Sequence, residues 1–327
     1  MAGSILITGG AGYVGSHVVK ALVAQNRRVV VVDNLSTGHL ENIQSIPFVQ
    51  ADIQDKQTLS NVIDTEDVTA IMHFAASTVI SDSIARPLDY YENNTVGTLH
   101  LLEVCNDKNI KHFIFSSTAA VYAPATGNIA EDFPLVPTNP YGHSKIMSEQ
   151  LVKDIAKTGA LSYVILRYFN VAGADMSGMI GQRTENATHL LKVAVEVACG
   201  SKPRIPIYGD DYPTFDGTCI RDFIHVDDLA AAHIDALTYL ENNGVSITLN
   251  CGYGKGYSVK EVIAALESIT GHPIRTSLEN RREGDIASVV ADNTLIKKTL
   301  NWQPRYDDIT IMVKSAYEWE KKLIRLT

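Results

Sequence analysis

The sequence lacks any apolar run that approaches the roughly 18 residues of a membrane-spanning helix. The first strand-like segment begins at residue 4, which leaves no room before it for a signal peptide. We therefore expect a soluble protein of the cytoplasm, with no membrane partner.

Cysteine is scarce, and the four residues of this type are Cys105, Cys199, Cys219 and Cys251. Their spacing matches neither a disulfide framework nor a metal site. We therefore predict free thiols in a reducing compartment and no bound metal.

Positive charge is also in short supply, with 28 Lys and Arg against 37 Asp and Glu, a net charge of −9. A nucleic-acid surface needs a basic stripe, so we predict no nucleic-acid partner. An anionic substrate would have to be met by locally placed arginines and not by the overall field.

Internal repeats, low-complexity tracts and proline-rich linkers are absent from the sequence. A chain of 327 residues is large for one core, so we expect one large domain and a smaller lobe. We expect the two to pack closely, with the functional site between them.

What the sequence does contain, almost at its start, is a strand-like run that ends in three glycines at three-residue spacing, Gly9, Gly12 and Gly15. An amphipathic segment, residues 16–25, follows. In a strand–turn–helix unit, the first glycine allows the turn, the second lets the backbone approach a phosphate, and the third lets helix pack on strand. The helix adds free N–H groups and the positive end of its dipole. This segment predicts a dinucleotide site.

The second apolar run, residues 28–33, ends in Asp33, 18 residues beyond Gly15. A carboxylate about 20 residues after the turn accepts the hydroxyls of the adenosine ribose. No Arg or Lys occurs in residues 34–40 to neutralise a 2′-phosphate, so the cofactor predicted is NAD and not NADP.

Apolar strands alternate with helices through the first half of the chain. This pattern predicts an α/β fold with a doubly wound, mostly parallel Rossmann sheet covered on both faces, plus a smaller α/β substrate-binding lobe. Strands are expected at 47–52, 69–76, 112–117 and 163–168, and helices at 56–63 and 87–107.

The alternation of strands and helices ends at about residue 171, and the glycine-rich polar stretch at 173–184 is predicted to be a loop. Helices are predicted at 189–199 and 258–270, a strand at 247–250, and two short helices at the C-terminus. We assign residues 1–170 to the NAD-binding domain, with re-entry around 219–250. Residues 171–218 and 251–327 form the smaller lobe.

Two strand ends carry further candidates for the cofactor site. Asp52 and Ile53 could reach the adenine edge, although Asp52 is equally well a loop acid or a helix N-cap. Phe74 and Ala75, with Ala76, give a small-residue floor where a flat cofactor could pass, a feature that packing alone also produces.

The chemically informative cluster combines a hydroxyl-rich strand end, Ser116 to Thr118, with Tyr141 and Lys145. Tyr141 and Lys145 lie four residues apart after an Asn-Pro break, so they share one helix face. An ammonium beside a phenol favours the phenolate and lowers its pKa. We predict Tyr141 as a general base, Lys145 as its partner, and Thr118 or Ser117 as a hydrogen-bonding group on the same substrate hydroxyl.

At this point the sequence resembles the extended short-chain dehydrogenase/reductase family, and within it the nucleotide-sugar 4-epimerases. The resemblance runs nearly end to end and is carried by TGGAGYVGSH at 8–17, YYENN at 90–94, FSST at 115–118, YGHSK at 141–145, RYFN at 167–170, GTCIRDFIHV at 217–226 and REGD at 282–285. The last two are the most specific to the subgroup.

The resemblance implies three groups of site residues. Tyr141, Lys145 and Thr118 take the catalytic positions. The cofactor positions, with the glycine turn, are Gly9, Gly12, Tyr13, Val14, Gly15, Asp33, Asn34, Asp52, Ile53, Phe74, Ala75, Asn94, Ser116, Tyr141, Lys145 and Tyr168. The substrate positions are Thr118, Asn170, His189, Leu190, Tyr208, Arg221, Arg282, Asp285 and Val289. Planar guanidinium forks suit the pyrophosphate of a UDP-sugar.

The implied reaction is the redox-neutral epimerisation of a UDP-hexose at C4, in which the sugar passes through a transient 4-keto form. Tyr141 takes the proton of the 4-hydroxyl, hydride passes to NAD and then returns to the opposite face of the sugar. NAD is regenerated in each cycle and stays bound. The resemblance also implies a homodimer.

Two positions depart from the pattern or modify it. Thr78 stands where these epimerases often carry a lysine that touches cofactor phosphate. Val289 matches the position that limits the size of the sugar, where a small residue admits N-acetyl sugars. We hypothesise that UDP-N-acetylhexosamines are accepted as well.

Other functions remain open alternatives. A 4,6-dehydratase, a decarboxylase or a pentose epimerase would share the fold and the first oxidation. Dehydration typically needs an Asp-Glu pair after the strand-end threonine, and here Thr118 is followed by two alanines. A non-catalytic NAD-binding sensor would be expected to lack the Tyr/Lys pair that this sequence keeps.

Overall fold

The computed structural model describes residues 3–124, 127–184, 187–282 and 285–326. Its centre is a seven-stranded sheet in which every neighbouring pair is parallel. In spatial order the strands are β3 (Phe48–Gln50), β2 (Val29–Asp33), β1 (Ser4–Thr8), β4 (Val68–His73), β5 (His112–Thr118), β7 (Ser162–Tyr168) and β11 (Ile247–Cys251). The predicted doubly wound parallel sheet is confirmed.

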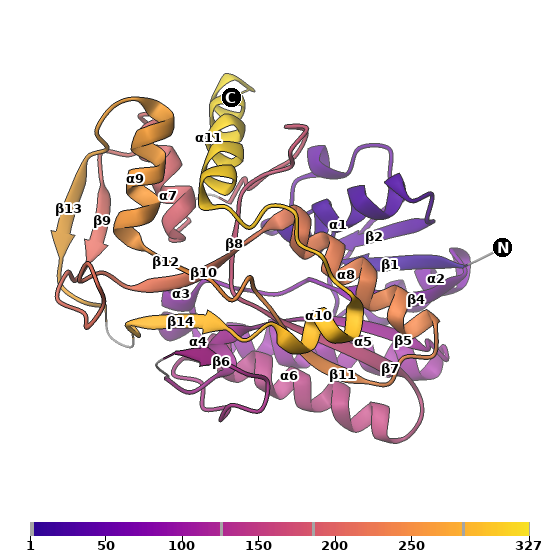
Figure 1. Ribbon diagram of the computed structural model, residues 1–327. Helices are drawn as coiled ribbons and strands as arrows, with labels where there is room; N and C mark the ends of the chain where they lie inside the picture. The colour runs from indigo at the N-terminus through magenta and orange to yellow at the C-terminus, as the bar shows by residue number, and fades with distance from the viewer. Residues whose placement is uncertain (1–2, 125–126, 185–186, 283–284, 327) are drawn as a thin grey trace.

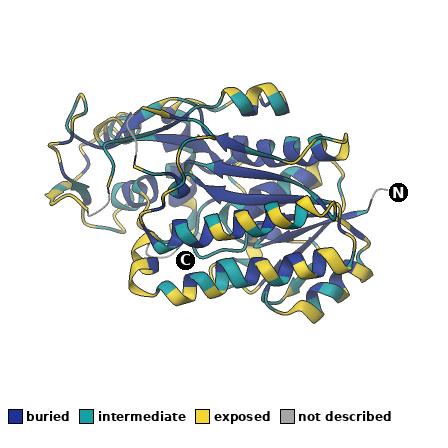
Figure 2. Ribbon diagram, turned by 90° about the horizontal axis from the view of Figure 1, so that it is seen from below, coloured by how far each residue is buried: buried dark blue, intermediate teal, exposed yellow. Residues whose placement is uncertain are grey.

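The side chains of each central strand alternate between the two faces of this sheet, as the period of two requires. In β1, Ile5 and Ile7 join one core and Leu6 joins the other. Helices α1 (Tyr13–Ala24) and α8 (Val226–Glu241) cover the first face. The second face is covered by α2 (Lys56–Thr65), α5 (Gly97–Asp107) and α6 (Pro140–Lys157). Figure 2 shows the buried strands between helices whose outer sides are exposed.

Several predicted helix boundaries need correction. Helix α1 begins at Tyr13 and not at residue 16, because the turn passes into the helix directly after Gly12. The helix predicted at 87–107 contains a π-helical turn, so it consists of α4 (Pro87–Tyr90), the π-helix η2 (Tyr91–Val96) and α5, preceded by α3 (Ile80–Ala85).

The prediction of two short C-terminal helices is wrong for the second one. Helix α10 (Thr294–Leu300) is short, but α11 (Ile309–Leu326) runs for 18 residues. Met312, Val313 and Ala316 on one side of α11 enter the same core as α7 (Leu190–Ala198) and α9 (Val259–Thr270), and this burial supports its length.

The second half of the chain builds two further sheets. One consists of β12 (Gly256–Ser258), β10 (Ile220–His225), β14 (Ser288–Ala291) and β6 (Asn128–Ile129), with β8 (Asn170–Ala172) also paired to β10. The other pairs β9 (Ile205–Tyr208) with β13 (Thr276–Glu279). Figure 1 shows β9, β13, α7 and α9 together at one end of the molecule. Strands β10, β8 and β14 lie between this end and the main sheet.

The path of residues 219–250 decides how the two parts are joined. Helix α8 and strand β11 return to the main sheet, whereas β10 pairs with β8 and β14 outside it. Two short 3-10 helices, η1 (Leu40–Ile43) and η3 (Ala119–Val121), complete the connections. No helix within the described ranges has both the length and the apolar character that crossing a membrane requires.

Candidate active site

The glycine turn between β1 and α1 is shaped by close backbone packing. Gly9 has a φ of 71°, in the left-handed region, and a Cβ there would lie 2.5 Å from the backbone nitrogen of Ala75. A Cβ on Gly15 would overlap the carbonyl oxygen of Gly9. Both positions therefore require glycine, and the turn lies directly against the segment that follows β4.

The N-terminus of α1 has the character of an anion site. Gly12 is the N-cap residue, and no side chain among the described residues caps it. A Cβ on Gly12 would meet one atom within 4 Å among the described residues, the carbonyl oxygen of Gly9 at 3.3 Å. The helix thus presents uncapped N–H groups and its positive dipole end toward open space, which fits the pyrophosphate of NAD.

Tyr13 and Val14 are placed to offer this site their backbone and not their side chains. The hydroxyl of Tyr13 donates to the carbonyl oxygen of Gly173, 2.5 Å away, and thereby links the turn to the second half of the chain. Val14 packs against the core.

Asp33 ends β2 beside the same turn. Its carboxylate accepts the backbone N–H groups of Ala11, at 3.0 Å, and Leu35, at 2.8 Å. Burial raises the pKa of Asp33 above its ordinary value, and the two backbone donors oppose that shift. A Cβ on Gly38 would lie 2.9 Å from both carboxylate oxygens, so the glycine keeps the space above Asp33 free. This geometry fits a carboxylate that accepts ribose hydroxyls.

Asp52 follows β3 and bonds to its neighbours. Its carboxylate accepts the side-chain amide of Asn34 at 2.8 Å and the backbone N–H of Gln54 at 2.9 Å. The helix N-cap interpretation is wrong, because Asp55 caps α2. Ile53 is buried, and a Cβ on Gly97 would lie 2.5 Å from its Cδ1, so this side chain packs against the start of α5.

Asn94 occupies the π-helical turn and holds three segments together. Its side-chain nitrogen donates to the carbonyl oxygen of Ser77 and to the hydroxyl of Ser144, at 3.0 and 2.9 Å, and its oxygen accepts the Ser77 N–H at 2.8 Å. It therefore fixes the loop after β4 against α6. Thr78, the position that departs from the family pattern, lies in this loop next to Ser77.

Helix α6 positions the predicted catalytic pair at the carboxyl end of the sheet. The helix begins at Pro140, and the Asn139 side chain caps it by accepting the N–H of Gly142 at 2.9 Å. Tyr141 hydrogen-bonds with Thr118 at the end of β5, and Lys145 lies with its ammonium 4.3 Å from the ring centre of Phe115. The structure thus brings together all three predicted catalytic residues.

The expected effect of Lys145 on Tyr141 is wrong for the chain by itself. Burial raises the pKa of Tyr141 to about 12, although its hydrogen bond with Thr118 opposes this. Burial also lowers the pKa of Lys145 to about 7, with Glu149 acting in the opposite direction. Both charged forms are disfavoured because both side chains are buried, and the four-residue spacing does not reveal this desolvation.

Alternation along β5 separates its three hydroxyl residues. Ser117 points away from the site and donates to Glu149 at 2.6 Å, so it is not a second candidate for the substrate hydroxyl. Ser116 lies on the other face, where its hydroxyl is 3.1 Å from Nε2 of His233 and hydrogen-bonds with Tyr168.

His233, which the sequence analysis did not single out, lies against three of the predicted cofactor residues. Its ring lies 4.8 Å from that of Phe74 and 6.1 Å from that of Tyr168, measured between centroids. It thus backs Ser116, Phe74 and Tyr168 from α8, a helix 117 residues away from Ser116 in sequence. A lone histidine in an amphipathic helix gives no local signal of this contact.

The second half of the chain brings the predicted arginines together with their predicted neighbours. Arg221 on β10 lies beside Val289 on β14 in the parallel register, and its guanidinium is 3.5 Å from the Asp285 carboxylate. Arg282 stacks on the ring of Tyr208, 3.6 Å from its centre. Residues 283–284 of the same motif lie outside the described residues.

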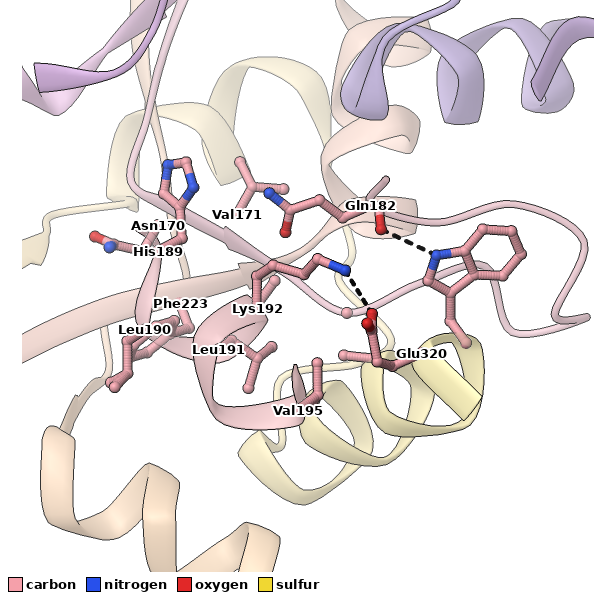
Figure 3. Close-up of a pocket in the computed structure, with 14 residues that line it drawn as sticks. Asn170, Val171, Gln182, His189, Leu190, Leu191, Lys192, Val195, Phe223 and Glu320 are labelled. Carbon is pink, nitrogen blue, oxygen red and sulfur yellow. Dashed lines mark hydrogen bonds and ion pairs between the residues drawn. The ribbon is translucent and has the colours of Figure 1, made fainter. Parts of the chain in front are cut away.

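Asn170, His189 and Leu190 line one pocket between β8, α7 and α11 (Figure 3). Burial lowers the pKa of His189, so the ring is neutral at physiological pH. Deeper in the pocket, Lys192 forms a buried ion pair with Glu320 at 2.5 Å. The sequence analysis missed this pair, because its members lie 128 residues apart.

Comparisons with known proteins agree with this architecture. The sequence model of the NAD dependent epimerase/dehydratase family matches residues 5–252. A UDP-glucose 4-epimerase of Azospirillum brasilense is 48% identical over 98% of this chain and 92% of its own.

Two solved structures are similar over essentially their full length. A UDP-glucose-4-epimerase from Stenotrophomonas maltophila, crystallised with bound NAD and formylated UDP-arabinopyranose, has a TM-score of 0.97 and 38% identity, with 100% of each chain covered. The UDP-Glc/GlcNAc 4-epimerase of Campylobacter jejuni has a TM-score of 0.86 and 45% identity, with 98% of this chain and 100% of that chain covered. This chain belongs to the NAD dependent epimerase/dehydratase family.

Proposed function

We propose that this protein is an NAD-dependent 4-epimerase that interconverts UDP-galactose and UDP-glucose. The observation that carries the proposal is the contact between Tyr141 and Thr118, with Lys145 one helical turn from Tyr141, at the carboxyl ends of the strands. Ligands of open parallel sheets bind at these ends. The names of the related proteins support the same reaction.

The site residues are proposed as three groups around this centre. NAD binds along Gly9, Gly12, Tyr13, Val14, Gly15, Asp33, Asn34, Asp52, Ile53, Phe74, Ala75, Asn94, Ser116, Tyr141, Lys145 and Tyr168. The nucleotide sugar binds Thr118, Asn170, His189, Leu190, Tyr208, Arg221, Arg282, Asp285 and Val289. Residues 1–170 with the re-entry around 219–250 hold the cofactor, and the smaller lobe, 171–218 and 251–327, holds the substrate.

The residues of the chain divide the work of the reaction. Tyr141 takes the proton of the sugar 4-hydroxyl and later returns it, and Thr118 hydrogen-bonds with Tyr141 and orients the proton transfer. Bound NAD supplies the acceptor for the sugar hydride and a positive charge that favours the phenolate. The arginines hold the UDP moiety while the flat 4-keto sugar turns over within the site.

A second substrate class is supported by Val289. This side chain packs against the small core formed by Val121, Tyr122 and Phe169, next to the strand end that carries Thr118. It also lies beside Arg221 in the parallel register of β10 and β14. A valine leaves room there for an N-acetyl group, and a relative named UDP-Glc/GlcNAc 4-epimerase is 45% identical.

A homodimer fits the apolar surface of the helices on the second face of the sheet. Helix α6 contacts α3, α4 and α5, and α3 contacts α4. Their exposed large apolar side chains are Ile80, Ile84, Leu88, Leu99 and Met147. A second copy of the chain would cover them. We propose this face as the dimer contact and the cytoplasm as the location. Sedimentation of Leu88→Glu, expected to be monomeric, tests the dimer.

The reaction is tested with purified protein, UDP-galactose and coupled detection of UDP-glucose. Turnover without added NAD is expected, and Tyr141→Phe should lose at least a thousandfold in kcat while it retains NAD. Tyr317→Phe, on α11 with its ring beside Lys321, is the matched control and should act as wild type. Bound NAD without turnover would favour a sensor, and a 4-keto-6-deoxy product would favour a dehydratase.

A further inference from the structure

Glu149 is a buried carboxylate on the catalytic helix to which the proposed chemistry gives no role. It follows Tyr141 and Lys145 at four-residue intervals on α6, so the three side chains lie along one face of the helix. Its side chain is 0% exposed. A fully buried charge is costly unless its oxygens are satisfied, so its partners indicate what it does.

Three side chains surround this carboxylate: Ser117 from β5, Arg167 from β7 and Lys153 from α6 itself. Oε1 accepts the hydroxyl of Ser117 at 2.6 Å and Nε of Arg167 at 2.9 Å. Oε2 accepts Nη2 of Arg167 at 2.6 Å and Nζ of Lys153 at 3.0 Å. Burial raises the pKa of Glu149, but the hydrogen bonds and charge of Arg167, with Lys153 and Ser117, outweigh it and the pKa is lowered. Glu149 is therefore ionised.

The partners of Glu149 come immediately before two residues of the site. Ser117 on β5 and Arg167 on β7 are neighbours in the parallel register, and the next pair in that register is Thr118 and Tyr168. One carboxylate thus holds the ends of two adjacent strands against α6. Because side chains alternate, Thr118 and Tyr168 then point to the opposite face.

The same carboxylate acts on the charge of Lys145. Among the described residues, the titratable groups that interact electrostatically with Lys145 are Glu149 on its own helix and His73 on β4, and Tyr141 lies one helical turn before it. His73 is neutral, since burial lowers its pKa to about 3. Glu149 is therefore the negative charge that favours the Lys145 ammonium. Glu149 itself is faced by Arg167 and Lys153, and by the phenols of Tyr122 and Tyr163.

We propose that Glu149 is a positioning residue of the active site. It holds the ends of β5 and β7 on α6, and so fixes Thr118, Tyr168 and Lys145 relative to Tyr141. The inference deepens the proposed function, because the roles of Tyr141, Thr118 and Lys145 rest on it.

The test compares Glu149→Gln, Ser117→Ala and Arg167→Lys with wild type over a range of pH, with UDP-galactose as substrate. Glu149→Gln should lower kcat at least tenfold, change KM less than threefold, and move the alkaline limb of kcat at least half a pH unit lower. Ser117→Ala keeps the charge of Glu149, so it should lower kcat three- to tenfold without moving that limb. Arg167→Lys keeps a cation beside Glu149 but loses the planar guanidinium fork. Its loss of kcat and its shift of the alkaline limb should both lie between those of Ser117→Ala and Glu149→Gln. Asp154→Asn, an exposed carboxylate of the same helix, is the matched control.

A readout independent of turnover separates this inference from the proposed function. The pH titration of the Lys145 resonance in isotope-labelled protein, assigned with Lys145→Met, should shift to lower pH in Glu149→Gln. That shift is expected even if the wild type does not epimerise UDP-galactose.

The inference is overturned if Glu149→Gln keeps both the alkaline limb and the Lys145 titration of the wild type, and if its loss of activity is no larger than the fraction of the variant that is unfolded. If Glu149→Gln does not fold, Ser117→Ala decides alone, and an unchanged kcat in that variant refutes the proposal.

Discussion

Replacing Gly12 by alanine should weaken NAD binding roughly tenfold to a hundredfold and leave the fold intact. Gly12 has φ −74° and ψ 179°, an extended conformation that alanine adopts without strain. The added Cβ meets the Gly9 carbonyl oxygen at 3.3 Å and no other described atom within 4 Å. Alanine gains about 0.4–1 kcal/mol by restricting the unfolded chain, and the close contact offsets part of this gain. The free energy of unfolding should therefore change by no more than about 1 kcal/mol.

The effect on the ligand is larger because the methyl group fills the space through which a phosphate reaches the first turn of α1. Loss of one backbone hydrogen bond to a charged group costs about 1.5–3 kcal/mol. That corresponds to a dissociation constant for NAD raised by roughly tenfold to a hundredfold.

Gly15→Ala is the matched comparison, because its Cβ overlaps the Gly9 carbonyl oxygen and must distort the turn. It should lose both NAD binding and stability. Binding is measured by calorimetry on NAD-free protein, and the free energy of unfolding by urea titration. A Gly12→Ala variant that binds NAD like the wild type would refute the assignment of the phosphate to this turn, and one as unstable as Gly15→Ala would refute the steric argument.

Three further predictions concern the substrate site and the buried histidines. Val289→Tyr should lower kcat/KM for UDP-N-acetylglucosamine at least tenfold and that for UDP-galactose less than threefold, as measured by product formation; equal losses would contradict the size argument. Arg221→Lys keeps the charge but loses the planar fork, so the KM for UDP-galactose should rise about tenfold with kcat within threefold, and a loss confined to kcat would contradict a binding role. Burial lowers the pKa of His73 to about 3 and that of His233 to about 4, from an ordinary value of 6.5, so below pH 6.5 the unfolded chain binds more protons and stability falls. Each histidine should cost about 2 kcal/mol at pH 5 relative to pH 8, as measured by urea unfolding. His233→Gln should therefore lose about 2 kcal/mol of this pH dependence, and a pH dependence equal to that of the wild type would contradict the argument.

Local patterns along the sequence were sufficient to predict the main sheet and the candidate site residues in the first half of the chain. The strands of the Rossmann sheet are short apolar runs that alternate with amphipathic helices, and both periods depend on near neighbours only. The glycine turn, Asp33 and the Tyr141/Lys145 pair are each defined within about 20 residues, so their placement followed from spacing.

Where the prediction failed locally, a distant contact was the cause. The C-terminal helix α11 is long because Met312, Val313 and Ala316 are buried in a core shared with α7 and α9. Ser117 could not be separated from Thr118 by residue type, and only Glu149 on α6 shows which of the two hydroxyls points away.

The sequence by itself determined the strands of the main parallel sheet and the position of the glycine turn between β1 and α1. It also provided the prediction that Tyr141, Lys145 and Thr118 carry the chemistry. The tertiary structure alone decided that β8, β10, β14 and β6 form one sheet, which places Val289 beside Arg221. It also decided that Tyr141 and Lys145 are buried, so that desolvation is the largest influence on the pKa of each. Pairing between distant strands and the loss of water around a side chain depend on which remote segments meet there, and one-dimensional spacing does not contain that information.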